Sequence, residues 1–365
     1  MLDVISYKKK EYIIKLKNKS NSRKILIFGA GSIGNHMSYA CSKLGFEVWI
    51  TDKNQKALNR MKKLVYPKRY GKWNNKIKQI NFSEINRLGQ KFELVIIGTP
   101  PETHSKIYNL CIKKINFNKL LIEKPIFHVN EKKLNKLRKT MNSKMVFCGY
   151  NHSISPSFEY FNKYIFTKID RIQKINVEWC ESWDGILGAH FWLKNEFGSY
   201  LGDYSKGGGS LQEHSHGLHL LNLLLKKRKI NLLNLKIYSN SIFFRGKKKY
   251  DILSRFTGYS QNIYISYLTD LITNPADKRI IIHGPLKRYE WICNYKKERD
   301  IIKIYKNNVM IFKKIFKKTR SSEFENEIKH IMNINKIKDR NNSNLNTDNA
   351  IDIVKFIKKF LTHEK

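Results

Sequence analysis

The sequence contains few acidic residues, few cysteines and no long apolar run. Only 30 of its 365 residues are Asp or Glu, against 70 Lys and Arg, which gives a formal net charge of +40. The five cysteines are scattered without a Cys-x-x-Cys pair, which is typical of buried thiols in a reducing compartment. No apolar run approaches the roughly 20 residues that a membrane-spanning helix needs, and the first residues lack a signal-peptide pattern. We therefore expect a cytoplasmic protein that does not use a membrane.

The excess of positive charge has two explanations. Nucleic-acid binding requires Lys and Arg, but a groove for single strands would show basic blocks separated by aromatic residues. Here the basic residues are spread along the whole chain, Lys far outnumbers Arg, and Ile and Asn are also abundant, as in proteins from AT-rich genomes. We therefore expect no nucleic-acid partner, although a basic surface would help to attract an anionic small substrate or cofactor.

The start of the chain predicts a dinucleotide-binding loop. The apolar run Lys24–Phe28 leads directly into Gly29-Ala30-Gly31-Ser32-Ile33-Gly34 and a helical stretch, and Asp52 closes the next apolar run. In such a loop the glycines permit a tight turn, a close approach of a pyrophosphate and packing of the helix, whose N-terminus attracts phosphate. Asp52 would accept hydrogen bonds from the adenosine ribose and repel a 2′-phosphate. NAD is therefore favoured, and NADP is possible because Lys53 follows.

Strands and helices continue to alternate up to Gly149, which predicts a doubly wound parallel sheet. Ligands bind outside the carboxyl ends of such strands. Thr99-Pro100 with His104 follows one expected strand, and Glu123-Lys124-Pro125 follows the next. These residues, the glycine loop and Asp52 should therefore meet in one crevice. The other strands expected in this half are 76–80 and 144–149, with a loop at 66–73 and a helix at 130–141.

After Gly149 the pattern predicts a second, mostly antiparallel α+β domain. Short alternating runs are separated by turns, and two helical stretches close the chain. We therefore divide the sequence into an N-terminal arm (1–22), a dinucleotide-binding domain (23–149) and a C-terminal substrate and oligomerisation domain (150–365). In that last domain we expect strands at 171–180, 234–239, 251–256, 262–268, 279–283 and 301–305, helices at 323–338 and 347–361, and an irregular segment at 181–206.

A glycine triplet, Gly207-Gly208-Gly209, precedes an unusual cluster of titratable residues. Glu213, His216 and His219 are each three residues apart, so on one helix they fall within an arc of roughly 120°. A carboxylate and two imidazoles on one face suit proton transfer. The alternative is a helix N-terminus with surface histidines. A metal site that also uses His214 is a further alternative, but these positions cannot all point one way, and we expect no metal.

Together, these motifs resemble the glucose–fructose oxidoreductase, inositol dehydrogenase and MocA (Gfo/Idh/MocA) family. The order and spacing of the glycine loop with Asp52, Thr99-Pro100 with His104, Glu123-Lys124-Pro125 and the triplet with its acid and His carry the resemblance, over residues 23–363. It implies an NAD(P)-dependent sugar or cyclitol dehydrogenase with a Rossmann N-terminal half. It also implies an open, mostly antiparallel C-terminal sheet that is often used for oligomerisation, so we expect a homo-oligomer, a dimer or a tetramer.

The resemblance also implies roles for single residues. Lys124 would contact the nicotinamide ribose and the substrate oxygen, Glu213 is the acid of the helix, and His216 is the proton-relaying imidazole. The cofactor would contact Gly29-Ala30-Gly31-Ser32-Ile33-Gly34, Asp52, Thr99, Pro100, His104, Glu123 and Lys124, and the substrate would contact Lys124, Tyr150, Asn151, His216 and His219.

The sequence departs from the commoner family pattern at three places. That pattern has Asp at the acid position, His four residues later and then a second Asp, where this chain has Glu213, His216 at plus three and His219. The Arg often found after the sixth strand is here Ser153. The Glu-x-Ser-His version resembles enzymes of surface-polysaccharide sugar synthesis, which suggests a nucleotide-linked or acidic sugar as substrate.

The expected reaction is a reversible hydride transfer between a sugar carbinol and C4 of nicotinamide. His216 would take the hydroxyl proton, oriented by Glu213, and Lys124 would stabilise developing negative charge on the oxygen. The alternative is a catalytically idle, NAD-binding scaffold or regulatory relative, which would keep the glycine loop but need not keep Lys124 and His216.

Overall fold

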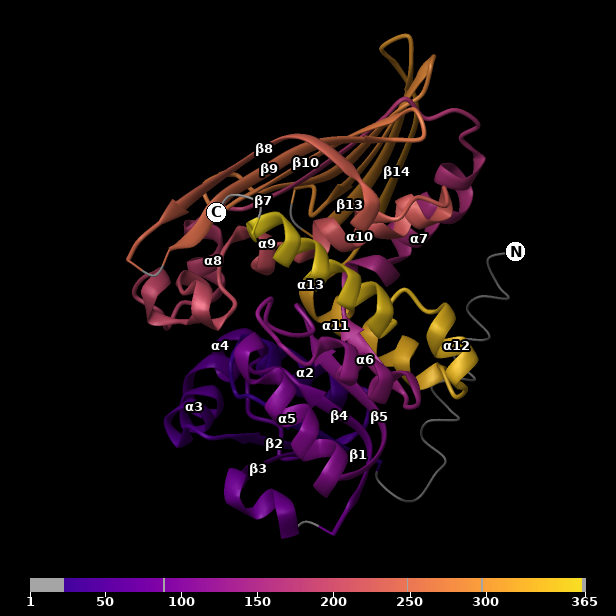
Figure 1. Ribbon diagram of the computed structural model, residues 1–365. Helices are drawn as coiled ribbons and strands as arrows, with labels where there is room; N and C mark the ends of the chain where they lie inside the picture. The colour runs from indigo at the N-terminus through magenta and orange to yellow at the C-terminus, as the bar shows by residue number, and fades with distance from the viewer. Residues whose placement is uncertain (1–22, 88, 248, 297, 363–365) are drawn as a thin grey trace, which may run out of the picture. The chain divides into compact units, whose positions relative to one another are not determined.

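The computed structural model describes residues 23–87, 89–247, 249–296 and 298–362 (Figure 1). They form two compact units. One consists of the described chain up to Thr99 together with Tyr108–Leu121, and the other consists of Pro100–Ile107 and the chain from Ile122 onward. The predicted N-terminal arm, residues 1–22, lies outside the described residues.

The N-terminal half forms a six-stranded sheet in the order β3-β2-β1-β4-β5-β6. The pairings of β1 with β2 and β4, and of β2 with β3, are parallel. The apolar strand residues are buried on both faces, as a parallel sheet requires. This order is that of the dinucleotide-binding Rossmann fold, so the predicted fold class is confirmed. The strands are β1 (Lys24–Phe28), β2 (Glu47–Asp52), β3 (Ile77–Asn81), β4 (Lys91–Ile97), β5 (Asn116–Glu123) and β6 (Val146–Gly149).

The helices of this half begin close to their predicted positions, with two corrections. Residues 66–70 form the short helix α4 (Tyr66–Tyr70) instead of a loop, because Pro67 is tolerated in a first turn and Tyr66 packs against Tyr39 and Trp73. The helix predicted from residue 130 starts four residues later, as α6 (Leu134–Asn142). The other helices are α2 (Ser32–Lys43), α3 (Gln55–Arg60) and α5 (Pro101–Lys114).

The C-terminal half contains an eight-stranded sheet in the order β14-β13-β12-β11-β7-β10-β9-β8. Its pairings are antiparallel except for the parallel pair β7–β10, which confirms the predicted architecture. Two strands, β12 and β14, were not predicted. The strands are β7 (Lys174–Cys180), β8 (Lys236–Arg245), β9 (Tyr250–Ser260), β10 (Ile263–Asp270), β11 (Asp277–His283), β12 (Lys287–Cys293), β13 (Arg299–Lys306) and β14 (Val309–Lys317).

Helices α10 (Ser215–Lys227) and α13 (Thr347–Thr362) pack on one face of this sheet (Figure 1). Their leucines, isoleucines and phenylalanines join the inward residues of β7, β9 and β10 in one apolar core. The other helices of this half that concern the site are η3 (Asn151–Ile154), α7 (Pro156–Tyr160), α11 (Arg320–Asn333) and α12 (Ile337–Asn342). None of the helices in the described part of the chain is long and apolar enough to cross a membrane.

The segment 181–206, expected to be irregular, contains the helix α8 (Trp183–Ala189) and three short 3₁₀ turns. Trp183 and Leu201 pack with Tyr250 in a small apolar cluster of their own. The indole N–H of Trp183 donates to the hydroxyl of Tyr250 at 3.2 Å. These contacts attach the segment to the start of β9.

Candidate functional site

The glycine loop of the first unit is shaped by two close backbone approaches. Gly29 has φ +104°, and a Cβ there would lie 2.7 Å from the carbonyl oxygen of Gly98, beside Thr99. A Cβ at Gly34 would lie 1.8 Å from the carbonyl oxygen of Gly29. Only glycine therefore lets β1, the loop and α2 pack in this way.

The N-terminus of α2 fits a pyrophosphate. Gly31 is its N-cap residue and offers no side chain to the first-turn N–H groups, and nothing lies within 4 Å of a Cβ placed on Gly31. The loop segment from Ala30 through Ser32 to Ile33 leads from the strand into this helix. Uncapped N–H groups beside open space, at the positive end of the helix dipole, are the features that bind a phosphate.

Asp52 and Arg69 flank this loop with opposite charges. The Asp52 carboxylate accepts the N–H of Ala30 and the N–H of Asn54, both at 2.8 Å. Since each carboxylate oxygen can accept two hydrogen bonds, Asp52 keeps capacity for a ribose hydroxyl. Arg69, on α4, donates to the Ser32 hydroxyl at 3.1 Å. The sequence analysis did not single out Arg69.

His104 is buried in the second unit and does not reach the surface. Its Nδ1 lies 3.2 Å from the carbonyl oxygen of Pro125 and 3.1 Å from that of Ile126. Because carbonyl oxygens only accept, Nδ1 carries the proton. The carbonyl of Pro100 accepts the N–H of Thr103 and so begins α5. His104 therefore ties the first turn of α5 to the chain that follows Lys124.

Lys124 and Glu213 form an ion pair. Lys124 follows β5, and its Nζ lies 3.1 Å from Oε2 of Glu213 and donates to the Glu213 carbonyl oxygen. Their side chains are 11% and 20% exposed. Burial alone would raise the pKa of the Glu213 carboxyl, but the charge and hydrogen bond of Lys124, together with nearby His214 and His190, outweigh it and hold that pKa below its usual value. The pair is thus a cation and an anion held together at a partly exposed position.

The helix expected to carry all three titratable residues is broken at His214. Glu213 ends the short helix α9 (Ser210–Glu213), and His216 lies in the first turn of α10. Glu213 and His216 are partly exposed, whereas His219 is 1% exposed. The ring of His219 stacks on Tyr150, with centroids 4.0 Å apart. The break separates Glu213 from the helix that carries His216 and His219, and of the two histidines only His219 is fully buried.

The imidazole of His216 lies among aromatic rings. Its centroid is 5.5 Å from Tyr150 and 4.6 Å from His152, and its Nδ1 has no hydrogen-bond partner among the described residues. Burial, then the neighbouring His152 and Lys124, lower the pKa of His216 well below its usual value. Burial also lowers the pKa of His219 to about 3. Both rings are therefore neutral at pH 7, and His216 is ready to accept a proton.

The glycine triplet is a packing device. Gly209 has φ +103°, and a Cβ there would lie 1.9 Å from Oδ1 of Asp251. Asp251, on β9, accepts the Ser210 hydroxyl at 2.6 Å and the Leu211 N–H at 2.9 Å, so it caps α9. A Cβ at Gly208 would lie 2.2 Å from the Leu201 carbonyl oxygen. The triplet thus fixes the start of α9 against the sheet.

Two buried carboxyl groups, those of Glu123 and Glu327, lie close to each other. A Cβ on Gly149 would come within 2.9 Å of the Glu123 carboxyl. Burial raises the pKa of Glu123 to about 7 against the opposing charge of Lys124. Glu327, on α11, is fully buried, and its oxygens have no hydrogen-bond partner in the described part of the chain. Burial and the nearby Glu123 raise the pKa of Glu327 well above its usual value.

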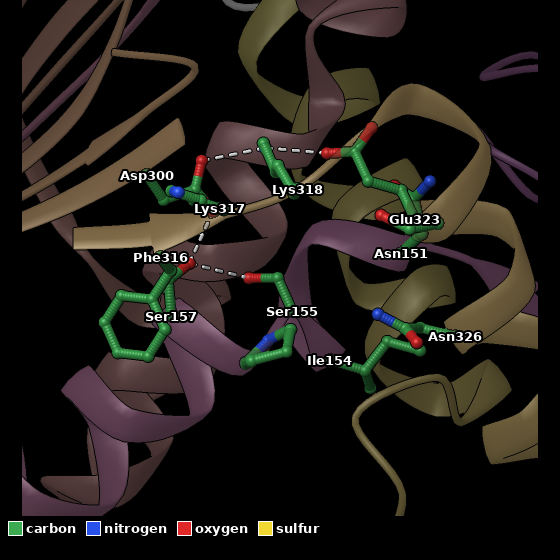
Figure 2. Close-up of a pocket in the computed structure, with 12 residues that line it drawn as sticks. Asn151, Ile154, Ser155, Ser157, Asp300, Phe316, Lys317, Lys318, Glu323 and Asn326 are labelled. Atoms are coloured by element: carbon green, nitrogen blue, oxygen red, sulfur yellow. Dashed lines mark hydrogen bonds and ion pairs between the residues drawn. The ribbon is translucent and has the colours of Figure 1, made fainter. Parts of the chain in front are cut away.

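A pocket of about 130 Å³ lies beside Asn151 (Figure 2). Lys318 crosses it between Asp300, at 2.8 Å, and Glu323, at 2.7 Å. Asn151 is the one predicted site residue that lines it. Among the residues that the structure describes, no three His, Cys, Asp or Glu side chains are arranged to hold a metal ion.

Several residues of this site were missed from the sequence. His152 follows Tyr150 and Asn151 directly after β6, and its position at a strand's carboxyl end could have indicated a role. No sequence motif marks Asp251, because it is distant in sequence from α9 and the fold of the sheet brings its carboxylate to the start of that helix. The glycine loop with Asp52 belongs to one unit, and Lys124, Glu213 and His216 belong to the other, so their meeting in one crevice stays a prediction.

No protein-family model matches the sequence, and no curated protein matches it. Solved structures do match. UDP-N-acetylglucosamine 3-dehydrogenase GnnA from Acidithiobacillus ferrooxidans is 11% identical, with a TM-score of 0.64 over 92% of this chain and 95% of that one. KijD10, a 3-ketoreductase from Actinomadura kijaniata in complex with NADP and TDP-benzene, is 10% identical, with a TM-score of 0.67 over 92% and 95%.

The dehydrogenase MviM from Clostridium difficile is 13% identical, with a TM-score of 0.62 over 94% of this chain and 100% of that one. At these identities the likeness is one of fold. The chain therefore shares the fold of these dehydrogenases and of this ketoreductase along nearly its whole length, which confirms the predicted resemblance at the level of the fold.

Proposed function

We propose that the protein is an NAD(P)-dependent oxidoreductase that transfers a hydride between nicotinamide and a hydroxyl- or carbonyl-bearing carbon of a sugar or sugar derivative. The observation that carries this proposal is the Lys124–Glu213 pair, 3.1 Å apart, followed by the partly exposed His216. These residues supply a cation, an anion and a neutral imidazole. An imidazole can take up a proton, and a cation can stabilise an oxyanion. The shared fold supports the proposal.

In this proposal, different residues bind the cofactor and transfer the proton. The glycine loop would hold the pyrophosphate, Asp52 the adenosine ribose, and Thr99 and Glu123 the neighbouring parts of the dinucleotide. When bound, NAD(P) supplies the hydride chemistry. In the oxidation, His216 takes the hydroxyl proton while Lys124 stabilises the negative charge that develops on the oxygen. Because the Glu213 carboxylate reaches Lys124, we assign it the task of holding that lysine.

NAD is the preferred cofactor in this proposal, and NADP is tolerated. Asp52 disfavours a 2′-phosphate, whereas Arg69 and Lys53 add positive charge beside the loop. KijD10, which shares the fold, is described in complex with NADP. The ratio of kcat/KM for the two cofactors measures the balance.

A nucleotide-linked sugar, as used in surface-polysaccharide synthesis, is the proposed substrate class. Two solved structures of this fold are a UDP-N-acetylglucosamine dehydrogenase and an enzyme holding TDP-benzene. The net charge of +40 would attract a diphosphate. We place Tyr150 and Asn151 near that substrate, with His219 supporting Tyr150 from behind.

We also propose a homo-oligomer in the cytoplasm. On β10, Tyr264 points away from the core and is 62% exposed, and it meets Tyr259, which contacts Tyr238. Val309, on β14, is 65% exposed. Exposed apolar side chains on a wide sheet favour association with a second copy. Use of NAD(P) and the five free, buried cysteines support the cytoplasmic location. Light scattering of the purified protein tests the assembly.

The test of the proposed function is a panel of UDP- and dTDP-linked sugars with NAD⁺ and NADP⁺, read as absorbance of the reduced cofactor. We expect turnover that is lost in Lys124→Met and His216→Gln, while both variants still bind the cofactor. Cofactor binding without turnover of any sugar, in either direction, would establish the idle scaffold instead.

A further inference from the structure

Helix α4 is fixed against α2 by a group of aromatic rings. Tyr70, the last residue of α4, stacks on Tyr39 of α2, with ring centroids 3.7 Å apart and planes at 5°. The hydroxyl of Tyr70 also hydrogen-bonds Nδ1 of His36, which lies one turn earlier on α2. Tyr66, the first residue of α4, has its ring centroid 6.2 Å from that of Tyr39. Because both ends of α4 are held in this way, the helix has a fixed place beside α2.

Arg69, the residue before Tyr70, contacts the start of α2. Its guanidinium donates to the Ser32 hydroxyl at 3.1 Å, and it donates to the Ser32 carbonyl oxygen and to Oδ1 of Asn35, both at 3.4 Å. Ser32 is the first residue of α2 and follows the N-cap residue Gly31. The segment expected to be a loop rich in basic and aromatic residues therefore places a cation beside the helix N-terminus that fits a pyrophosphate.

These contacts of Arg69 suit exchange with an anion. Arg69 is partly exposed, so an anion that approaches from solvent can reach it. The three acceptors on Ser32 and Asn35 are neutral, and a hydrogen bond from a guanidinium to a phosphate oxygen is stronger than a bond to a neutral acceptor. The planar guanidinium also matches the geometry of phosphate. A phosphate at the loop can therefore replace one of the two 3.4 Å contacts while α4 stays in place.

Asn35 carries an unsatisfied donor in the same turn of α2. Its side chain is fully buried, and its Nδ2 has no hydrogen-bond partner among the residues that the structure describes. Most buried polar groups are paired, so an unpaired donor calls for an explanation, such as a group that is not part of the chain. Beside it lie the open space at Gly31 and the guanidinium of Arg69. Donors and room for an anion therefore occur together at this end of α2.

We propose that Arg69 is a cofactor-binding residue that contacts the pyrophosphate of the dinucleotide from the side of α4. This inference rests on the proposed function and adds to it a binding residue outside the glycine loop. The N–H groups at the start of α2 and the guanidinium share the negative charge of the pyrophosphate. Arg69 also offsets the negative charge that Asp52 brings to the same ligand.

The proposed contact separates affinity from cofactor preference. The pyrophosphate is common to NAD and NADP, whereas only NADP carries a 2′-phosphate. Arg69 therefore strengthens the binding of both cofactors by the same factor, and the ratio between them depends on Asp52 and Lys53.

The decisive variant is Arg69→Gln, which removes the charge but keeps a side chain that can hydrogen-bond Ser32. We expect the Kd values for NAD⁺, NADP⁺ and ADP-ribose, measured by calorimetry, each to rise about tenfold or more, as for the loss of one charge-assisted hydrogen bond. The Kd for adenosine, which has no phosphate, should stay within about twofold of the wild-type value. Urea unfolding of the variant without ligand checks that the fold is kept.

The matched control is Lys68→Gln, which removes the same charge from the neighbouring, exposed position on α4. It should change the Kd for NAD⁺ by less than about twofold, as is usual for a solvated surface charge. An equal loss of affinity in both variants would overturn the contact, because the charge of α4 as a whole would then be responsible. A loss confined to NADP⁺ would overturn the contact with the pyrophosphate in favour of the 2′-phosphate, and equal weakening of adenosine would show that Arg69 only shapes the loop.

Because these measurements need no turnover, they separate this inference from the proposed function. A wild type that binds neither NAD⁺ nor NADP⁺ overturns the proposed function and this inference with it. A wild type that binds NAD⁺, with an Arg69→Gln variant of equal affinity, overturns only the role of Arg69.

Discussion

Lys124 Nζ lies 3.1 Å from Oε2 of Glu213, although 89 residues separate them in the chain. The lysine follows the last residue of β5, and the carboxylate ends α9. Lys124 also donates to the backbone carbonyl of Glu213, so the ammonium group is held by two acceptors of one residue. A lysine fixed in this way has one N–H left for a substrate oxygen.

Removing this lysine should stop the chemistry and leave the fold. We expect Lys124→Met to lower kcat by about 10² or more, in the range of general acid–base catalysis, because the developing oxyanion loses its cation. The measurement is steady-state turnover of the best sugar. Lys226→Met, which breaks the ion pair of Lys226 with Asp352 at 2.7 Å, should change kcat less than twofold. A loss under tenfold for Lys124→Met would count against its assigned role.

In the pH profile of kcat/KM for the oxidation, the loss of activity on the acid side should lie below pH 6.5. His216 must be neutral to take a proton, and burial with the neighbouring cations lowers its pKa well below the usual value. Activity is therefore kept as pH falls through 6.5 and is lost only at the lower pKa of the folded protein. A profile of kcat/KM from pH 4.5 to 8 measures this, and a limb at or above 6.5 would contradict it.

His219 should make the fold less stable in mild acid. Its pKa in the folded protein is about 3, against about 6.5 when unfolded. The unfolded state therefore binds the proton first, and stability is lost as pH falls below 6.5. Between pH 6.5 and 5 this amounts to about 2 kcal/mol. His219→Phe, which keeps the stack on Tyr150, should remove that part of the loss in urea unfolding. Between pH 7 and 8 both proteins should show the same slope.

Gly209→Ala should destabilise the protein severely. A Cβ at this φ of +103° would meet the Asp251 carboxylate at 1.9 Å, so both backbone strain and a clash oppose it. We expect a loss of about 3 kcal/mol or more in the free energy of unfolding. Urea unfolding of the purified variant measures it. A loss below about 1 kcal/mol would show that α9 can shift.

Gly31→Ala is the contrasting case. Nothing lies within 4 Å of a Cβ at Gly31, so stability should change by less than about 1 kcal/mol. The methyl group would occupy the space where the pyrophosphate approaches the helix N-terminus. We expect the Kd for NAD⁺ to rise about tenfold or more in calorimetry. Unchanged affinity would move the phosphate site away from the loop.

Most of the six-stranded sheet could be predicted, because buried parallel strands are continuous apolar runs such as Lys24–Phe28 and are closed by glycines or acids. Strands β12 and β14 were not predicted because neither sequence alternates as a half-buried strand does: β12 begins with Lys287-Arg288, and β14 has four consecutive apolar residues, Val309–Phe312, before Lys313-Lys314. The residues of β14 are also largely exposed at the sheet edge. A local pattern of charge cannot distinguish such a strand from a loop.

The sequence identified several residues of the candidate site, but it did not predict how they are arranged. Lys124, Glu213 and His216 were identified from motifs. The break at His214 was not, because it depends on Asp251 and on the backbone at Leu201, both distant in sequence. The spacing of His219 suggested a face shared with His216, and both rings do contact Tyr150, but His219 is buried whereas His216 is partly exposed. His152 carries no recognisable spacing to His216.

The cap of α9 by Asp251 has a consequence for how freely the candidate site can vary in sequence. Glu213, the residue that holds the lysine, ends a helix that is anchored through the Asp251 carboxylate and Gly209 to the start of β9, so the position of Glu213 depends on the sheet. Variation there would displace Glu213 itself. Because the carbonyl of Leu201 accepts the Gly209 N–H at 3.1 Å, the segment 181–206 is tied to the same anchor, and the start of β9, this segment and α9 must therefore change together.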